Sequence, residues 1–276
     1  MTKGLFELRI WGVRGSLPIA SRTCSRFGGN TTTFELRCGQ HVLFFDAGSG
    51  FPLAGKALQA EGKRAFHLFF SHCHYDHIMG LPFFLPLYDK EATATFWSGH
   101  LGAGMTTEAM IADFMRTPFF PVGPAVFNAR VANHTFLPGD RLRPCDGVEL
   151  QTRMLNHPGG AIGYRIDHDG RSVAMIFDTG HVPGTLDQAV MDLIKGVDLF
   201  LYDATFTEEE FERYPDFGHS TWRQGVRLAM AAGAKRVGFV HHSPGRTDDE
   251  LEGIEAEAQK LFPGAFCARD LQVIAL

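Results

Sequence analysis

Four apolar runs of the chain each end at a residue of a type that binds metal ions. Residues 66–70 lead to His72, 172–177 to Asp178, 197–202 to Asp203, and 236–240 to His241. In layered α/β folds, sites are built on loops that leave the carboxyl ends of strands, because the sheet holds several such ends near one another. The pattern therefore predicts a sheet whose strand ends bring these distant residues together.

The densest group of such residues lies between positions 71 and 77, where the chain reads Ser-His-Cys-His-Tyr-Asp-His. His72, His74, Asp76 and His77 form an H-x-H-x-D-H cluster, and the two-residue period of an extended chain puts His72 and His74 on one side. Imidazole and carboxylate groups suit zinc and its neighbours. Leaving them unpaired at a buried strand end would be costly, so the cluster predicts a metal site that could hold two ions.

Length and charge narrow the class of protein. A chain of 276 residues with 45% apolar content can bury a full core, and we expect a single domain over residues 1–276. The net charge of −5 and the dispersed 26 Lys and Arg residues give no basic surface, which argues against an enzyme that grips long nucleic acid. A nucleotide or another small anion is compatible with this charge.

The spacing of the cysteines and the hydropathy of the chain indicate where in the cell the protein is located. The five cysteines are scattered and include no C-x-x-C pair, so we expect reduced thiols. The first ten residues alternate polar and apolar side chains without the apolar core of a signal peptide, and no stretch reaches the roughly 18 apolar residues of a membrane span. These features predict a cytoplasmic protein that does not enter the membrane.

Strands dominate the first part of the chain. Phe6, Leu8 and Ile10 alternate with polar residues, and residues 31–38 and 41–46 flank Gly39-Gln40, which is typical of a tight hairpin turn. We therefore expect a β-meander here. From residue 172 onward, strands and helices alternate, which favours layers of helix packed on sheet.

Three helices of the second part have start and stop signals. The first is expected to begin at Thr185 with Gln188 as capping partner, the second to run from about Thr221 to Ala232 and to be closed by Gly233, and the third to begin at Thr247 with Glu250 as partner. The inward faces would carry Leu186, Val190, Leu193 and Ile194 in the first helix, and Leu251, Ile254, Ala258 and Leu261 in the third.

Residues 97–138 differ in composition from the rest of the chain. Their glycines and prolines alternate with four phenylalanines, Phe114, Phe119, Phe120 and Phe127. This composition is typical of an insertion folded over a cleft, and we expect that role. An irregular connector that packs only for itself is the alternative.

Three other residues near these motifs are not expected to bind metal directly. Asp46, in Phe45-Asp-Ala-Gly48, is expected to turn the backbone or to hydrogen-bond a metal ligand. Cys73 lies between two candidate ligands, but strand alternation points it away from them, toward the core. His181, close after the Phe-Asp-Thr-Gly stretch, is expected on the surface, with a contact to substrate as the alternative.

The motifs, taken in order, resemble those of the metallo-β-lactamase superfamily. The matching stretches are residues 71–77, Asn-His-Pro-Gly at 156–159, Phe-Asp-Thr-Gly at 177–180 and Val-His-His-Ser at 240–243. Residues 12–16, 28–32, 45–48, 202–206 and 218–221 are similar, more narrowly, to the phosphodiesterase branch that includes ribonuclease Z and cyclic-phosphate phosphodiesterases. The resemblance implies an α/β (α+β) fold, a four-layer αββα sandwich of two mixed sheets flanked by helices, and a homodimer.

The resemblance also implies a ligand set for two divalent metal ions. His72, His74 and His157 would bind the first ion, Asp76, His77 and His241 the second, and Asp178 would bridge them. Zinc is the expected metal, with manganese or iron as alternatives. A hydroxide held between the ions would attack phosphorus.

Some of these assignments have structural competitors. His157 could be a loop histidine beside Pro158, Asp178 could cap the turn before Gly180, and His242 competes with His241 for one ligand position. The spacing to Ser243 favours His241.

The catalytic residues that the resemblance implies are Asp76, His219 and Asp203. His219, in His-Ser-Thr, would protonate the leaving group, and Asp203, where that branch usually has Glu, would orient it. Alternatively, His219 only precedes the helix that Thr221 caps.

We therefore expect a binuclear metal-dependent phosphodiesterase acting on a small molecule such as a cyclic nucleotide or cyclic phosphate. A metal-dependent lactone, thioester or amide hydrolase is the second hypothesis. A sensor or scaffold with purely structural metals is the third, which an open coordination position would oppose.

Overall fold

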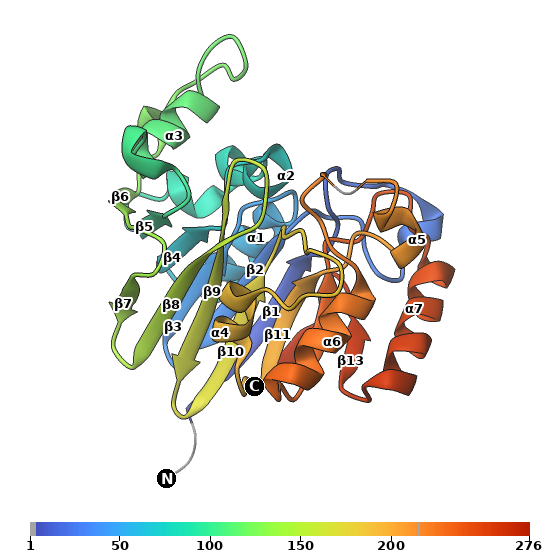
Figure 1. The fold of residues 1–276 in the computed structure, drawn as a ribbon. Helices are drawn as coiled ribbons and strands as arrows, with labels where there is room; N and C mark the ends of the chain where they lie inside the picture. The colour runs from blue at the N-terminus through green and yellow to red at the C-terminus, as the bar shows by residue number, and fades with distance from the viewer. Residues whose placement is uncertain (1–3, 215) are drawn as a thin grey trace.

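The computed structural model describes residues 4–214 and 216–276, in which two seven-stranded sheets pack face to face (Figure 1). The strands of the first sheet, in spatial order, are β14 (Val273–Ala275), β1 (Phe6–Gly12), β2 (Thr33–Cys38), β3 (His41–Phe45), β4 (Ala65–Phe70), β5 (Thr93–Ser98) and β6 (Arg130–Thr135). Those of the second are β13 (Ala265–Cys267), β12 (Val237–Val240), β11 (Leu199–Asp203), β10 (Arg171–Ile176), β9 (Ala161–His168), β8 (Val148–Leu155) and β7 (Arg141–Cys145).

Both sheets are mixed, as expected. In the first sheet, β14, β1, β2 and β3 pair antiparallel, and β3, β4, β5 and β6 pair parallel. In the second, β10 to β13 pair parallel and β7 to β10 antiparallel. The predicted meander is confirmed: β2 and β3 form a hairpin in which Cys38 pairs with His41, and Gly39 supplies the positive φ of 58° that the turn needs.

Three apolar clusters separate the layers. The first lies between the sheets and joins Phe34, Phe45 and Phe69 of one sheet to Tyr164 and Leu201 of the other. The second joins the outer face of the second sheet to helices α4 (Gln188–Ile194), α6 (Trp222–Ala232) and α7 (Asp248–Leu261). The third covers the outer face of the first sheet with α1 (Phe51–Ala60) and α3 (Thr107–Phe114). The predicted helix–sheet–sheet–helix order is confirmed.

Short helical turns occupy the connections. They are α2 (Tyr75–Ile78), α5 (Glu208–Phe211) and the 3₁₀ turns η1 (Arg22–Cys24), η2 (Leu81–Phe83), η3 (Leu85–Tyr88), η4 (Gly102–Gly104) and η5 (Pro124–Val126). Within the described part of the chain, no helix has both the length and the apolar content needed to cross a membrane.

Two of the three predicted caps are confirmed. The Thr221 side chain accepts a hydrogen bond from the backbone N–H of Gln224 at the start of α6, and Gly233 ends that helix in the left-handed conformation. At α7, Thr247 and Glu250 form the expected capping box. Leu251 and Ala258 are buried as predicted, whereas Ile254 is half-buried and Leu261 is 51% exposed, because Leu261 is the last residue of the helix.

The predicted cap of α4 is wrong by two residues, because Asp187 and not Thr185 caps the helix. The helix begins at Gln188, where the carboxylate of Asp187 accepts hydrogen bonds from the N–H groups of Ala189 and Val190. The Thr185 hydroxyl instead donates to the carbonyl of Val182. A carboxylate that accepts two N–H bonds caps a helix better than a hydroxyl outside it, and Leu186, left outside the helix, is 44% exposed.

The segment 97–138 contains regular structure. It includes the end of β5, then α3, then β6, which pairs parallel to β5, so its ends belong to the first sheet. The irregular part lies between α3 and β6. In Figure 1, α3 and this connector stand at the edge of the sandwich where α2 lies, beyond the ends of β5 and β6.

Candidate metal centre

The site lies at one edge of the sandwich, where strands of both sheets end. His72 and His74 follow β4, His157 follows β8, Asp178 follows β10 and His241 follows β12. Asp76 and His77 lie in the short helix α2, and Asp203 is the last residue of β11. The structure thus brings together the strand-end residues singled out in the sequence.

The first group of facing side chains consists of His72, His74, His157 and Asp178, whose nearest ligand-type atoms all lie within 4.8 Å of one another. His157 Nε2 is 3.1 Å from His74 Nδ1 and 3.7 Å from Asp178 Oδ2, and His72 Nε2 is 3.6 Å from the same oxygen. Three imidazoles and a carboxylate are a suitable donor set for one divalent ion. His74 is exposed, so the group opens to solvent.

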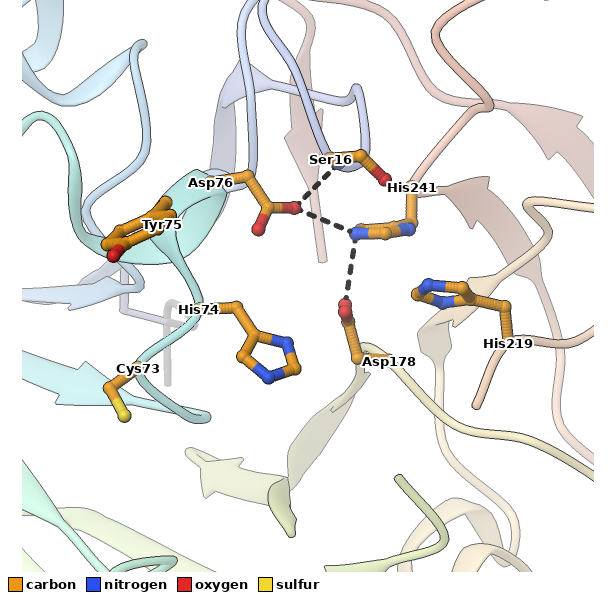
Figure 2. A pocket seen from close by; sticks show the side chains of 8 residues that line it. All are labelled: Ser16, Cys73, His74, Tyr75, Asp76, Asp178, His219 and His241. Atoms are coloured by element: carbon orange, nitrogen blue, oxygen red, sulfur yellow. Dashed lines mark hydrogen bonds and ion pairs between the residues drawn. The ribbon is translucent and has the colours of Figure 1, made fainter. Parts of the chain in front are cut away.

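The second group consists of Asp76, His77, Asp178 and His241. His241 Nε2 lies 3.1 Å from Asp76 Oδ2 and 3.2 Å from Asp178 Oδ1 (Figure 2). His77 Nε2 lies 3.1 Å from that same Oδ1. Asp178 therefore faces the first group with one oxygen and the second group with the other. This arrangement suits a carboxylate that bridges two ions.

Buried atoms without partners provide a test of whether metal ions fit. His72 Nε2, His77 Nε2 and Asp178 Oδ1 are buried and have no hydrogen-bond partner. Leaving such groups unpaired costs about 1–3 kcal/mol each. These atoms point into the two groups, so cations there would satisfy them.

The charges of the two groups give a second test of whether metal ions fit there. Burial opposes a positive charge on His77, yet the carboxylates of Asp178, Asp76 and Asp46 raise its pKa well above the ordinary value. Burial likewise opposes a negative charge on Asp178, yet His241, His77 and His72 lower its pKa. The carboxylates of Asp76 and Asp178 therefore stay ionised and attract positive charge, which divalent cations would supply.

Outer partners fix the orientation of the ligands around β4. His77 Nδ1 lies 2.8 Å from Asp46 Oδ2, and Asp46 also accepts hydrogen bonds from the backbone N–H and the hydroxyl of Ser71. The Ser71 hydroxyl lies 3.0 Å from His72 Nδ1. Asp46 thus both turns the backbone, at a φ of 59°, and holds a candidate ligand, as expected. Such partners leave each Nε2 free for a metal.

Two further histidines of the groups, His157 and His241, are held in the same way by loops on the side of the second sheet. His157 Nδ1 lies 2.8 Å from the carbonyl of Gly218, and His241 Nδ1 lies 2.9 Å from the Thr205 hydroxyl. That hydroxyl is also 2.8 Å from Asp203 Oδ1, so His241 is connected to Asp203 through one side chain. Thr205 lies in the stretch 202–206 that carries the phosphodiesterase resemblance, but its contact with His241 appears only in the structure, because it depends on the β11 and β12 ends being neighbours.

A loop from the far N-terminal part completes the second group. The backbone N–H of Ser16 donates to Asp76 Oδ2 over 2.7 Å, as Figure 2 shows. Gly15 packs under His241, where an added Cβ would lie 2.2 Å from Nδ1. The match of residues 12–16 to the phosphodiesterase branch marked this loop, but its contact with the metal centre appears only in the structure.

Strained backbone is concentrated around the centre. Ser16, Asp46, Asp178 and His241 all have φ values between 45° and 62°, in the left-handed region that residues with a Cβ rarely adopt. Each of them aims a side chain or an N–H group at the two ligand groups. Such strain persists only where the surrounding structure holds it, and it is typical of functional sites.

His219 and Asp203 lie beside the second group. Asp203 is fully buried and accepts hydrogen bonds from His219 Nδ1 over 2.8 Å and from the N–H groups of Thr179 and Thr205 over 3.1 Å. Burial disfavours a cation at His219, but Asp203 and the neighbouring carboxylates outweigh it and raise the pKa of His219 to about 9. His219 can therefore hold a proton at neutral pH and present it from Nε2.

The structure places the remaining candidates as follows. His242 points away from the groups, with Nε2 3.0 Å from the Ala268 carbonyl, so of these two competitors His241 is the one that faces the second group. His157 is buried in the first group rather than free in a loop. Cys73 points away from the ligands in Figure 2. The expectation for His181 is wrong: it is buried, stacked on Phe211 and hydrogen-bonded to Ser220.

A pocket of about 530 Å³ opens onto the centre. Its lining includes Asp76, Asp178, His241 and His219 together with Ser16 and Tyr75, drawn in Figure 2. Candidate ligands and candidate acid therefore face one solvent-accessible space, which is large enough for a phosphodiester with small substituents.

Known proteins are similar to this chain in sequence or in fold over nearly its whole length. Ribonuclease Z of Treponema denticola is 24% identical over 98% of this chain and 98% of its own. The metallo-β-lactamase fold protein YhfI from Bacillus subtilis superposes with a TM-score of 0.74 at 19% identity, covering 99% of both chains. A diphosphatase from the PhnP family gives a TM-score of 0.69 at 18% identity, covering 98% of both.

These similarities confirm the predicted resemblance to the metallo-β-lactamase fold and to ribonuclease Z. A family model provides the assignment, because residues 41–242, which include every candidate metal ligand, match the model of the β-lactamase superfamily domain. The chain belongs to the β-lactamase superfamily.

Proposed function

We propose that the protein is a metal-dependent hydrolase that cleaves small or cyclic phosphodiesters at a centre of two divalent ions. The observation that carries this proposal is the pair of ligand groups that share Asp178, with His219 beside them in one pocket. The full-length relatives support the reaction class, since one is named ribonuclease Z and another a diphosphatase of the PhnP family.

His72, His74 and His157 would hold one ion, and Asp76, His77 and His241 the other, with Asp178 between them. Histidine and carboxylate donors without a thiolate accept zinc, and also manganese or iron. Zinc is the metal we propose. When bound, the ions would neutralise phosphate charge and lower the pKa of a coordinated water toward 7.

The protein side chains supply the proton that the reaction needs. With Nδ1 held by Asp203, His219 presents its Nε2 to the pocket and can donate a proton to the departing alkoxide. Asp203 is a positioning residue, because it orients the imidazole and stabilises its protonated form. The Asp in place of the usual Glu reaches His219 at 2.8 Å, so the shorter side chain makes the contact.

The size and charge of the protein favour a small substrate. The pocket of about 530 Å³ has room for a mononucleotide-sized molecule, and the net charge of −5 gives a long RNA backbone little attraction. Substrates beyond this size, including RNA, belong in the test as alternatives.

The test of the proposal combines metal analysis with a substrate panel. Purified protein is expected to contain two divalent ions per chain and to hydrolyse bis(p-nitrophenyl) phosphate and a cyclic nucleotide faster than a lactone, a thioester or a structured RNA. Turnover of the lactone or thioester alone would refute the hypothesis of a phosphodiesterase. Preferred cleavage of RNA would refute the hypothesis that the substrate is a small molecule. A folded protein that binds metal and turns over nothing would point to a sensor.

The role of His219 has its own test. The His219→Ala variant is expected to lose about 100-fold or more on an alkyl ester, whose leaving group needs a proton, and much less on a p-nitrophenyl ester. His41→Ala, at the hairpin between β2 and β3, is the matched control and should leave both rates unchanged. Equal losses on both esters would contradict the assignment of His219 as acid.

A further inference from the structure

A second cavity, of about 600 Å³, lies next to the metal pocket. It is formed by α2, with Tyr75 and Ile78, and by the segment after β5, with Met105, Phe114, Phe119 and Phe120. We call it the apolar groove. It shares Tyr75 and Cys73 with the metal pocket, so the two cavities adjoin at these side chains.

The groove presents apolar surface to water. Tyr75 is 73% exposed, Phe119 74% and Met105 37%. Scattered exposed apolar residues are ordinary on a protein surface, but these three line one cavity beside a candidate active centre. A bound apolar group would cover them and gain from the area removed from water.

The charges of the groove are balanced within it. The charged side chains among its described lining residues are Asp113 and Arg116, which lie 3.6 Å apart, and the Arg116 guanidinium also lies over the Phe119 ring. No described lining residue of the groove is left with an unpaired positive charge for a phosphate. Its chemistry therefore suits a neutral substituent, aromatic or aliphatic, better than a nucleic-acid backbone.

The position of the groove identifies which part of the substrate it would take. In Figure 2, Tyr75 and Cys73 lie on one side of His74 and Asp178, and His219 lies on the opposite side. A phosphodiester carries two ester groups, and the one that leaves must lie at the acid, His219. The other ester group, which stays on phosphorus, then points toward Tyr75.

We propose that the apolar groove is a specificity site for the retained ester group, and that the natural substrate is a phosphodiester whose retained group is an uncharged aromatic or aliphatic substituent. This proposal rests on the proposed function. It also gives the segment 97–138 its role: residues 105–120 form a wall of the substrate site, as a cleft-covering insertion would.

The experiment keeps the leaving group constant and varies the retained group. Wild-type protein is assayed with methyl p-nitrophenyl phosphate and with phenyl p-nitrophenyl phosphate. Because one apolar group in a fitted pocket changes kcat/KM by about 10-fold or more, the phenyl ester is expected to be preferred by at least that factor. The ratio of kcat/KM for the phenyl ester to that for the methyl ester should fall toward one in the Phe119→Ala variant. It should fall further in a Phe119→Ala, Met105→Ala double variant.

The control variant is Leu261→Ala at the end of α7, which removes a 51% exposed apolar side chain far from the groove and should keep the wild-type preference. Both groove positions are exposed, so truncation spares the core. Equal rates on the two esters in wild-type protein, or a preference unchanged in the double variant, would overturn the groove proposal alone. Hydrolysis of neither ester would overturn the proposed function itself.

Discussion

Gly15 gives the sharpest test of how the second ligand group is built. In a Gly15→Ala variant the new Cβ would lie 2.2 Å from His241 Nδ1, 2.3 Å from Cε1 and 2.7 Å from Nε2. The loop cannot easily yield, because Gly15 N–H donates to the His242 carbonyl and Ser16 N–H to Asp76. Ordinary contact needs about 3.4 Å, so the ring must retreat by about 1.2 Å.

This displacement is large on the scale of metal coordination. A zinc–nitrogen bond is about 2.0–2.1 Å long, so moving the ring by more than half that length removes His241 from its place between Asp76 and Asp178. Loss of ligand positioning costs about 10–100-fold in metal affinity. We expect a weakening of the second ion in that range, or about 1.4–2.8 kcal/mol.

The assay is calorimetric titration of zinc into chelator-treated protein, with the number of bound ions checked by elemental analysis. Circular dichroism of the metal-free variant establishes that it is folded. Gly253→Ala in α7 is the matched control: its Cβ would meet nothing within 4 Å, so metal binding should be unchanged and stability should rise by about 0.5–1 kcal/mol. A Gly15→Ala protein that binds two ions with wild-type affinity would refute the reasoning.

Three further predictions concern the centre and the core behind it. Asp178→Ala, which removes the carboxylate shared by both groups, should reduce the bound metal to less than one ion per chain and the activity at least 100-fold; retention of two ions would contradict the bridging role. Tyr164→Phe removes a buried hydroxyl that donates to the Phe70 carbonyl over 2.6 Å, and should lower the free energy of unfolding in urea by about 1–3 kcal/mol; an unchanged midpoint would show that this bond contributes nothing. Removal of metal with a chelator should lower the melting temperature and added zinc should restore it, because ligands that bind the folded state stabilise it; equal melting temperatures of the two forms would count against a resident metal.

The sequence predicted those features that depend on neighbours along the chain. The caps at Thr221 and Thr247 are interactions between residues three positions apart, so they could be read from residue type and spacing. The wrong cap prediction at Thr185 also concerns neighbours along the chain. Asp187, two residues further on, offers a stronger hydrogen-bond acceptor, and only the local backbone conformation decides which of the two residues caps the helix. His181 was misplaced because its burial depends on Phe211, thirty positions away in the sequence.

The sequence by itself therefore determined the strand ends, the ligand types at 71–77 and, through the superfamily motifs, the order of helix and sheet layers. Only the tertiary structure decided which oxygen of Asp178 faces which group, that Gly15 and Thr205 hold His241, and that His242 turns away from it. The physical reason is that each of these contacts joins residues of loops that follow different strands. Sheet register and left-handed backbone at strand ends set their directions, and a shift of one residue would point each side chain to the opposite face. The apolar groove belongs to this second class, since it forms only where the segment after β5 lies against α2.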